Sequence, residues 1–153
     1  MNNESGRSLI EVIGVMALSA IMLAGTFQVY RVVRARMVRM EAAETLGDIA
    51  KNARLLFSAR GNYSGISTGF LIKAGALKTD RAPSIATEYD IQSAADGETF
   101  YINLSGMNFN NCAWIATQKF DWASDVYVND SREGAAAGNC KKSDKNKVSI
   151  VVK

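Results

Sequence analysis

The chain has 153 residues, a net charge of +3 and no histidine. Its 18 lysines and arginines are spread along the sequence and nearly balanced by 15 aspartates and glutamates, which argues against a nucleic-acid partner. The missing histidine removes the commonest general base and the commonest metal ligand, and no catalytic or phosphate-binding motif is present. We therefore expect a protein that is not an enzyme and that needs no metal and no other cofactor.

An uncharged apolar segment follows the short polar stretch of residues 1–6. It runs from Val12 to Phe27 and reaches Tyr30 when Gln28 is included, close to the roughly 20 residues that a helix needs to cross a bilayer. A single carboxylate, Glu11, stands at its start. A charge at membrane depth is costly, so Glu11 is a candidate functional residue; the alternative is that it lies among the lipid headgroups without a role.

The sequence beyond this segment has the pattern of an amphipathic helix. Apolar residues recur mostly at steps of three and four, and charged residues occupy the opposite face. No proline interrupts the pattern before Gly61-Asn62, so we predict one helix from about residue 8 to about residue 59. Such a helix is too long for the core of a small domain, and we interpret it as a stalk. The apolar face consists of Val29, Val32, Val33, Met37, Met40, Ala43, Leu46, Ile49, Ala50, Ala53, Leu56 and Phe57.

The residues after the stalk predict two further helices. The first is short, begins at a Ser67 cap and ends at Gly75. The second begins at an Asn111 cap and extends to Lys119. The segments that follow and separate these helices predict an antiparallel sheet of about four strands.

Segments rich in β-branched and aromatic residues predict that sheet, at residues 88–92, 98–104, 125–128 and 147–152. Asp96-Gly97 predicts a hairpin turn between the first two strands. Residues 133–139 are predicted to form a flexible loop. The fold class expected from this order is α+β, with the long N-terminal helix packed on a small antiparallel sheet.

Cys112 and Cys140 are the two cysteines of the chain. If the domain lies outside the cytoplasm, we expect them to form one disulfide that closes a loop of about 29 residues, worth roughly 3–4 kcal/mol. The alternative is a pair of unrelated buried thiols. The choice between them depends on which side of the membrane the domain occupies.

The segment from Gly6 through Glu11 to Phe27 resembles the leader and transmembrane start of type IV pilins and pseudopilins. The resemblance implies that a prepilin peptidase cuts between Gly6 and Arg7, that Arg7 becomes the new amino terminus and a candidate for N-methylation, and that Glu11 is the fifth residue of the mature chain. Residues 61–77 are similar to the region after the stalk in type IVb pilins, and Cys112 and Cys140 match the family's C-terminal disulfide.

The resemblance also implies an organisation and a set of partners. Residues 1–6 would be a leader peptide, residues 7–30 a transmembrane and filament-core helix segment, and residues 31–153 the amphipathic half of the helix with a globular α+β pilin domain, together shaped like a ladle. The partners would be other copies of the chain in a helical filament, the prepilin peptidase, the inner-membrane assembly machinery and, before assembly, the membrane. The protein would lie in the inner membrane with its domain in the periplasm, and afterwards in an extracellular pilus.

Within such a filament, Glu11 would pair with the amino terminus of a neighbouring subunit, because an unpaired buried carboxylate is costly. Two other functions fit the same features: a pseudopilin of a type II secretion system, and a membrane-anchored extracytoplasmic binding or adhesion domain that does not polymerise. The arginine cluster at Arg31, Arg34, Arg36 and Arg39 would by the positive-inside rule place the domain in the cytoplasm. The resemblance and the cysteine pair place it outside.

Overall fold

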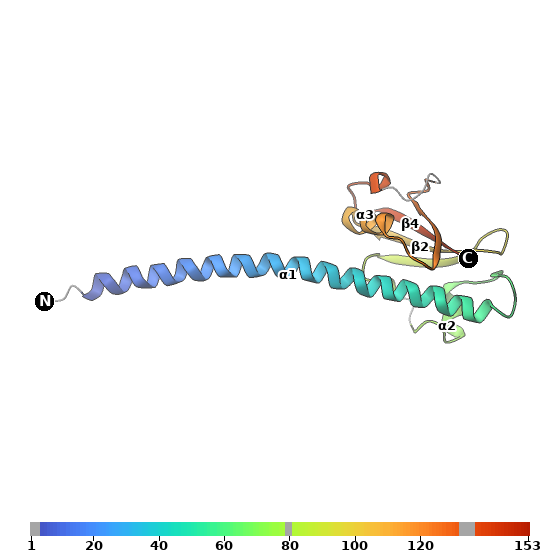
Figure 1. Ribbon diagram of the computed structural model, residues 1–153, viewed down its shortest axis with the longest axis horizontal. Helices are drawn as coiled ribbons and strands as arrows, with labels where there is room; N and C mark the ends of the chain where they lie inside the picture. The colour runs from blue at the N-terminus through green and yellow to red at the C-terminus, as the bar shows by residue number, and fades with distance from the viewer. Residues whose placement is uncertain (1–3, 79–80, 132–136) are drawn as a thin grey trace. The chain divides into compact units, whose positions relative to one another are not determined.

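The computed structural model of the protein describes residues 4–78, 81–131 and 137–153. The chain divides into two compact units, the first ending at Met37 and the second comprising Val38–Lys153. The first unit is a single stretch of helix, and the second is an α+β domain (Figure 1). The elements in chain order are α1 (Glu4–Phe57), α2 (Thr68–Lys73), β1 (Glu88–Ser93), β2 (Phe100–Met107), α3 (Phe109–Thr117), β3 (Ala123–Val128), the 3-10 turn η1 (Ala137–Asn139) and β4 (Asn146–Val152).

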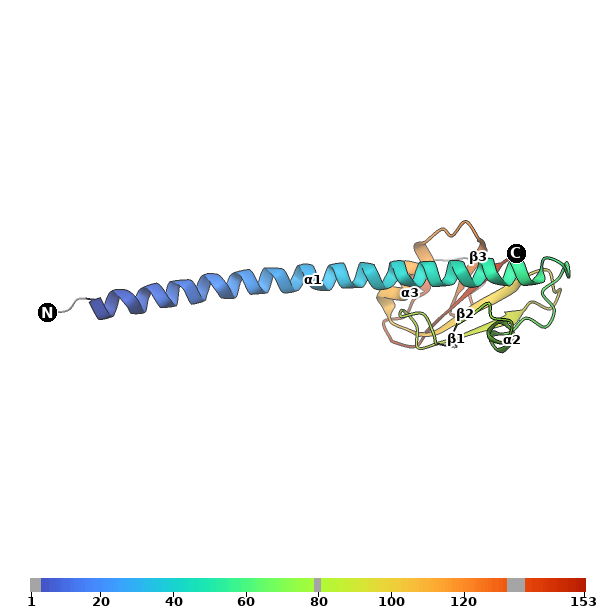
Figure 2. The same ribbon diagram turned by 90° about the horizontal axis from the view of Figure 1, so that it is seen from below.

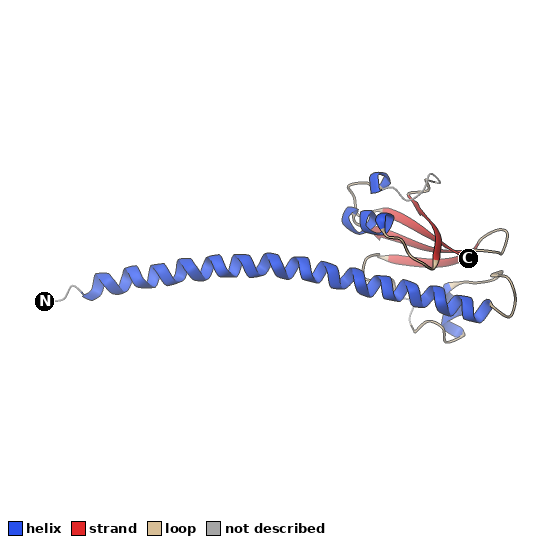
Figure 3. Cartoon of the chain, viewed as in Figure 1, coloured by secondary structure: helices blue, strands red, loops and turns tan. Residues whose placement is uncertain are grey.

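Helix α1 is continuous through both units, as the absence of proline predicts (Figure 3). It begins at Glu4, a few residues before the predicted start, and it ends at Phe57, two residues before the predicted end. The chain leaves the helix through a turn in which the Arg60 amide donates to the Phe57 carbonyl at 2.9 Å. Gly61 then adopts a φ of 69°, a conformation that stops a helix and favours glycine.

The sheet of the second unit has the strand order β1-β2-β4-β3, with every neighbouring pair antiparallel. Alternation along the central strand β2 explains its two faces: Phe100, Ile102 and Leu104 are buried, whereas the residues between them are only half-buried. Figure 2 shows the last part of α1 lying along the sheet of this unit. The fold class is α+β with the long helix packed on an antiparallel sheet, as expected.

The part of α1 inside the second unit contributes one face to the core. Its buried residues recur at steps of three and four, so they form a single stripe. Gly47 lies beside this stripe and leaves room for Trp122, whose Nε1 would lie 3.4 Å from an added Cβ atom. Burial of each large side chain contributes about 1.5–3 kcal/mol. The stripe consists of Ala42, Leu46, Ile49, Ala50, Ala53 and Phe57.

Ser67 caps α2 as predicted, since its side chain accepts a hydrogen bond from the Phe70 amide. The cap predicted for α3 was wrong. Asn108 is the N-cap, and Asn111 lies in the first turn, where its amide donates to Asn108 Oδ1 at 2.9 Å. Two asparagines three residues apart both satisfy the capping preference, and sequence alone did not identify which one leaves the helical conformation.

The strand boundaries also differ from the predicted ones. Strand β2 continues to Met107 instead of ending at residue 104, through a register shift that includes Gly106 with a φ of 70°. Asp96-Gly97 does lie in the β1–β2 hairpin, but the paired ends are Ser93 and Phe100, so the connection is longer than a two-residue turn. In the predicted loop at 133–139, residues 137–139 form η1 and the others lie outside the described residues.

Candidate functional site

The first unit of the protein exposes an apolar helix surface. Ile10, Ile21 and Met22 each keep more than two thirds of their surface exposed, at 75%, 71% and 72%. By length and composition, this part of α1 is apolar enough to cross a membrane, and none of its most apolar window is covered by the other residues that the structure describes. An apolar surface of this extent indicates a partner that covers it, either lipid or protein.

The hydroxyl groups within this surface do not make it polar. Ser19 Oγ donates to the Val15 carbonyl at 2.8 Å, and Thr26 Oγ1 donates to the Met22 carbonyl at 3.1 Å. Each hydroxyl is therefore satisfied by its own helix one turn earlier. Neither requires a hydrogen bond from lipid or from another chain.

Two glycines in this unit have no packing role within the part of the chain that the structure describes. A Cβ atom added to Gly14 or to Gly25 would meet nothing within 4 Å. A glycine inside a helix costs about 0.5–1 kcal/mol relative to alanine, so contacts within the chain do not explain either residue. In membrane helices, small residues allow another helix to approach closely.

Glu11 is exposed on α1 at the start of the apolar surface. Among the side chains that the structure describes, which begin at Leu9, none forms a hydrogen bond or ion pair with its carboxylate. The backbones of Gly6 and Arg7 belong to the first turns of α1. Arg7 precedes Glu11 by four residues, so the two lie about 6 Å apart along the helix axis. The predicted cleavage point and the carboxylate are thus within about one turn of each other.

Arginines mark the C-terminal end of the exposed apolar surface. Arg31 lies over the ring of Phe27 in the first unit, with 5.0 Å between the guanidinium carbon and the ring centroid. Arg39, in the second unit, is half-buried: its Nη2 donates to the Asn110 carbonyl at 3.3 Å, and its guanidinium lies 6.0 Å from the ring centroid of Trp114. Arg39 is therefore part of the domain, whereas Arg31, Arg34 and Arg36 are exposed.

The expected disulfide is present in the second unit. Cys112 on α3 and Cys140 after η1 are joined with an S–S distance of 1.99 Å and a Cα–Cα distance of 5.9 Å. Both residues are buried. The bond therefore ties the helix that follows β2 to the segment that leads into β4.

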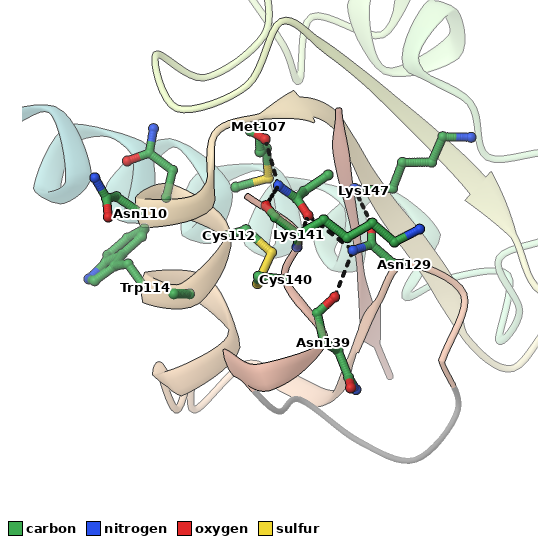
Figure 4. The surroundings of a disulfide bond; sticks show 12 residues. Met107, Asn110, Cys112, Trp114, Asn129, Asn139, Cys140, Lys141 and Lys147 are labelled. Carbon is green, nitrogen blue, oxygen red and sulfur yellow. Dashed lines mark hydrogen bonds between the residues drawn. A yellow bond between two sulfur atoms is a disulfide. The ribbon is translucent and has the colours of Figure 1, made fainter. Parts of the chain in front are cut away.

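A buried asparagine bonds the polypeptide around this disulfide; Figure 4 shows the disulfide together with Met107 and Lys141, two of the residues that this asparagine bonds. Asn146 is 1% exposed, and its Nδ2 donates to the carbonyls of Met107, Lys141 and Ser143. Its Oδ1 accepts hydrogen bonds from the Lys141 amide at 2.7 Å and from Asn129 Nδ2 at 3.0 Å. A single side chain thus satisfies backbone groups of two segments, the end of β2 and residues 141–143, and also bonds the side chain of Asn129.

Asn129 extends this network to the edge strand. Its φ of 49° places it in a left-handed turn after β3, a conformation that asparagine tolerates. Its Nδ2 also donates to the Asn139 carbonyl at 2.8 Å, and its Oδ1 accepts from the Lys147 amide at 2.9 Å. The disulfide-bonded segment is therefore held by side-chain hydrogen bonds from both β3 and β4.

Comparisons with known proteins agree with this geometry. The structure is similar to the crystal structure of TcpA, a type IV pilin from Vibrio cholerae El Tor biotype, with a TM-score of 0.57 and 14% sequence identity over 76% of this chain and 99% of that chain. The fold is that of a type IV pilin. No protein-family model and no curated protein sequence matches the chain. At this identity, the likeness to the type IV pilin concerns the fold.

The residues singled out from the sequence lie in two places: Gly6, Arg7 and Glu11 at the start of α1, and the two cysteines in the domain. Their roles in processing and assembly remain predictions, whereas the disulfide is observed. Sequence reasoning missed Asn129 and Asn146. The available signal for Asn146 was an asparagine at the start of an apolar β-strand pattern, since asparagine is uncommon in strands and usually has a specific reason to be there.

Proposed function

We propose that the protein is a structural subunit of a type IV pilus or a related filament. The observation that carries the proposal is the unburied apolar surface of α1 on a chain that otherwise has the fold of a type IV pilin. In the membrane, lipid covers this surface. In the filament, the corresponding helices of other copies cover it.

The proposed maturation step is cleavage between Gly6 and Arg7 by a prepilin peptidase. It leaves a new cationic amino terminus one turn of helix from Glu11. The protein before assembly spans the inner membrane once, with residues 38–153 in the periplasm. The disulfide supports this placement, because such bonds persist in oxidising compartments.

The proposed role of Glu11 is to select the assembly position. When the apolar helices of several copies bundle, a carboxylate without a cationic partner is left in a low-dielectric surrounding, at a cost of several kcal/mol. Pairing with the amino terminus of a neighbouring copy removes this cost. A copy that leaves the membrane is therefore most stable where its terminus meets the Glu11 of another copy.

Intact-mass measurement of the protein from its native cells tests maturation. We expect loss of residues 1–6, with or without one methyl group on Arg7. Gly6→Val should retain the leader, whereas the matched variant Ser5→Ala should be processed normally. Loss of the leader from Gly6→Val would contradict cleavage at this bond.

Electron microscopy of fibres tests assembly. We expect Glu11→Gln, which removes only the charge, to accumulate in the membrane without forming fibres. Thr26→Val is the control, because the Thr26 hydroxyl bonds its own helix and its loss should leave fibres unchanged. Normal fibres from Glu11→Gln would contradict the role of the carboxylate, and a processed wild-type protein that forms no fibres would favour the anchored, non-polymerising alternative.

A further inference from the structure

Exposed charged residues between Arg31 and Asp48 of α1 form two consecutive blocks of opposite sign. Arg39 does not belong to either block, because it is half-buried and donates to the Asn110 carbonyl. The exposed basic block is Arg31, Arg34 and Arg36, and the exposed acidic block is Glu41, Glu44 and Asp48.

Within one copy, this arrangement places like charges beside one another. Arg31 and Arg34 are three residues apart, as are Glu41 and Glu44, and Asp48 follows Glu44 by four. Like charges at these spacings face each other on a helix and destabilise it. No member of the basic block stands three or four residues from a member of the acidic block, so the two blocks cannot pair with each other within one helix; of their six members, only Asp48 has an exposed residue of opposite charge, Lys51, at such a spacing.

Arg36 and Glu41 are the nearest members of the two blocks, and they point to different sides of α1. Five residues separate them, which corresponds to about 140° around the helix axis. A contact between Arg36 of one copy and Glu41 of another therefore uses two different faces. Such a contact repeats from copy to copy and generates an open filament instead of a closed dimer.

The axial position of these residues agrees with the filament proposed above, on which this inference rests. Pairing of the Arg7 terminus of one copy with Glu11 of another shifts two parallel helices by four residues, about 6 Å. The same shift brings Arg36 to the level of Met40 in the other copy, about 1.5 Å along the axis from Glu41. One register thus satisfies the pair at the start of α1 and a second pair near its middle.

We propose that Arg36 of each copy pairs with Glu41 of a neighbouring copy, and that this ion pair sets the filament register together with Glu11. The partner is a second copy of this chain. Its exposed block carries the opposite charge and lies at the level that the shift of four residues requires. Exposed Met37 and Met40, at 64% and 72%, lie between the two blocks and supply apolar contact around the pair. Apolar surroundings exclude water and strengthen the attraction.

Charge exchange tests the proposal in the full-length chain. We expect Arg36→Glu and Glu41→Arg each to reduce fibre yield roughly tenfold or more, because each places like charges at the contact. The double variant should restore the yield to within about threefold of wild type, since the exchanged pair attracts equally. Lys51→Glu is the matched control: it is an exposed single charge reversal on α1 outside this register, and its yield should stay within about twofold of wild type.

Cross-linking gives an independent measurement. Both native cysteines are in the disulfide, so engineered cysteines supply the reactive thiols. We expect Arg36→Cys combined with Glu41→Cys to give a ladder of linked copies when fibres are oxidised, because within one helix the two side chains point apart and cannot bond. Arg36→Cys combined with Lys51→Cys should remain monomeric, since the shift of four residues leaves these positions far apart.

The outcomes separate this inference from the proposed function. Wild-type fibres with normal yields from Arg36→Glu, or cross-linking through the Lys51 position instead of the Glu41 position, would overturn the register while leaving the filament proposal intact. Absence of wild-type fibres would overturn both. Tryptophan-fluorescence unfolding curves equal to wild type in each variant would show that a lost fibre does not result from an unfolded domain, since Trp114 and Trp122 both lie in the second unit.

Discussion

The two parts of α1 contain leucine side chains that differ in how far they are exposed to solvent. Leu23, in the first unit, is 69% exposed, whereas Leu46, in the second unit, is fully buried. Both lie inside α1, and both follow the apolar spacing of a helix. The difference is that the second unit supplies a sheet to cover Leu46, whereas no other part of the described chain covers Leu23. An apolar helical pattern therefore identifies a surface that needs a partner, and the described part of the chain supplies none for the first unit.

The two units can be distinguished by measurement because both tryptophans, Trp114 and Trp122, lie in the second unit. Tryptophan fluorescence during denaturation of the full chain in mild detergent therefore reports the free energy of unfolding of the domain. Substitutions in the first unit should leave this quantity unchanged.

The largest effect is expected from removing the disulfide. Cys112→Ser with Cys140→Ser should lower the free energy of unfolding by about 3–4 kcal/mol, because the denatured chain regains the freedom of a loop of about 29 residues. Denaturant titration with and without a reductant checks the value. Equal stability of the bonded and unbonded forms would show that the hydrogen bonds of Asn146 and Asn129 hold this segment alone.

Substitution of Leu46 and of Leu23 tests the difference between the two units. Leu46→Ala should destabilise the domain by about 2–5 kcal/mol through lost burial and a residual cavity. Leu23→Ala removes the same atoms from the same helix and should change the domain by less than about 0.5 kcal/mol. A similar loss from both variants would mean that the apolar surface of the first unit contributes to the domain core.

Asn146→Ala is expected to cause the next largest loss of domain stability. It leaves buried carbonyls and the Lys141 amide without hydrogen-bond partners, which should cost about 2–3 kcal/mol. Lys142→Ala, an exposed neighbour in the same segment, is the control and should be nearly neutral. Full stability of Asn146→Ala would show that the network around the disulfide is not what orders this region.

The smallest predicted difference in domain stability is between alanine substitutions of two glycines, Gly106 and Gly25. Gly106 has a φ of 70°, and an added Cβ atom would lie 2.6 Å from Thr87 Cβ, so Gly106→Ala should cost the domain about 1–3 kcal/mol. Gly25→Ala meets no atom within 4 Å and should leave the domain unchanged. If Gly25→Ala nevertheless reduces fibre yield, the space beside Gly25 is occupied by another copy.

The features that sequence reasoning predicted are those with a local signal. The period of the apolar residues predicted α1, alternation predicted the strands, and Ser67 predicted the cap of α2. The disulfide followed from a count of two cysteines together with the expectation that the domain lies outside the cytoplasm. These signals depend on neighbours along the chain and need no knowledge of tertiary packing.

The features that were missed depend on residues distant in sequence. Asn146 satisfies the Met107 carbonyl, and Arg54 donates to the Lys153 carbonyl at 2.7 Å and to the Trp122 carbonyl at 2.9 Å. Nothing adjacent to either residue indicates these partners. The extension of β2 to Met107 was missed because a glycine commonly marks the end of a strand. In the sheet, Gly106 lies at an irregularity, and the pairing of β2 with β4 resumes at Met107.

The most direct test of the account is an electron cryomicroscopy reconstruction of fibres assembled from the wild-type chain. We expect residues 9–37 of every copy to lie in the fibre core, covered by the same segment of other copies. We also expect the amino terminus at Arg7 to lie within hydrogen-bonding distance of Glu11 in a neighbouring copy. Fibres in which this segment of α1 faces solvent, or in which Glu11 has no cationic neighbour, would contradict the proposed assembly.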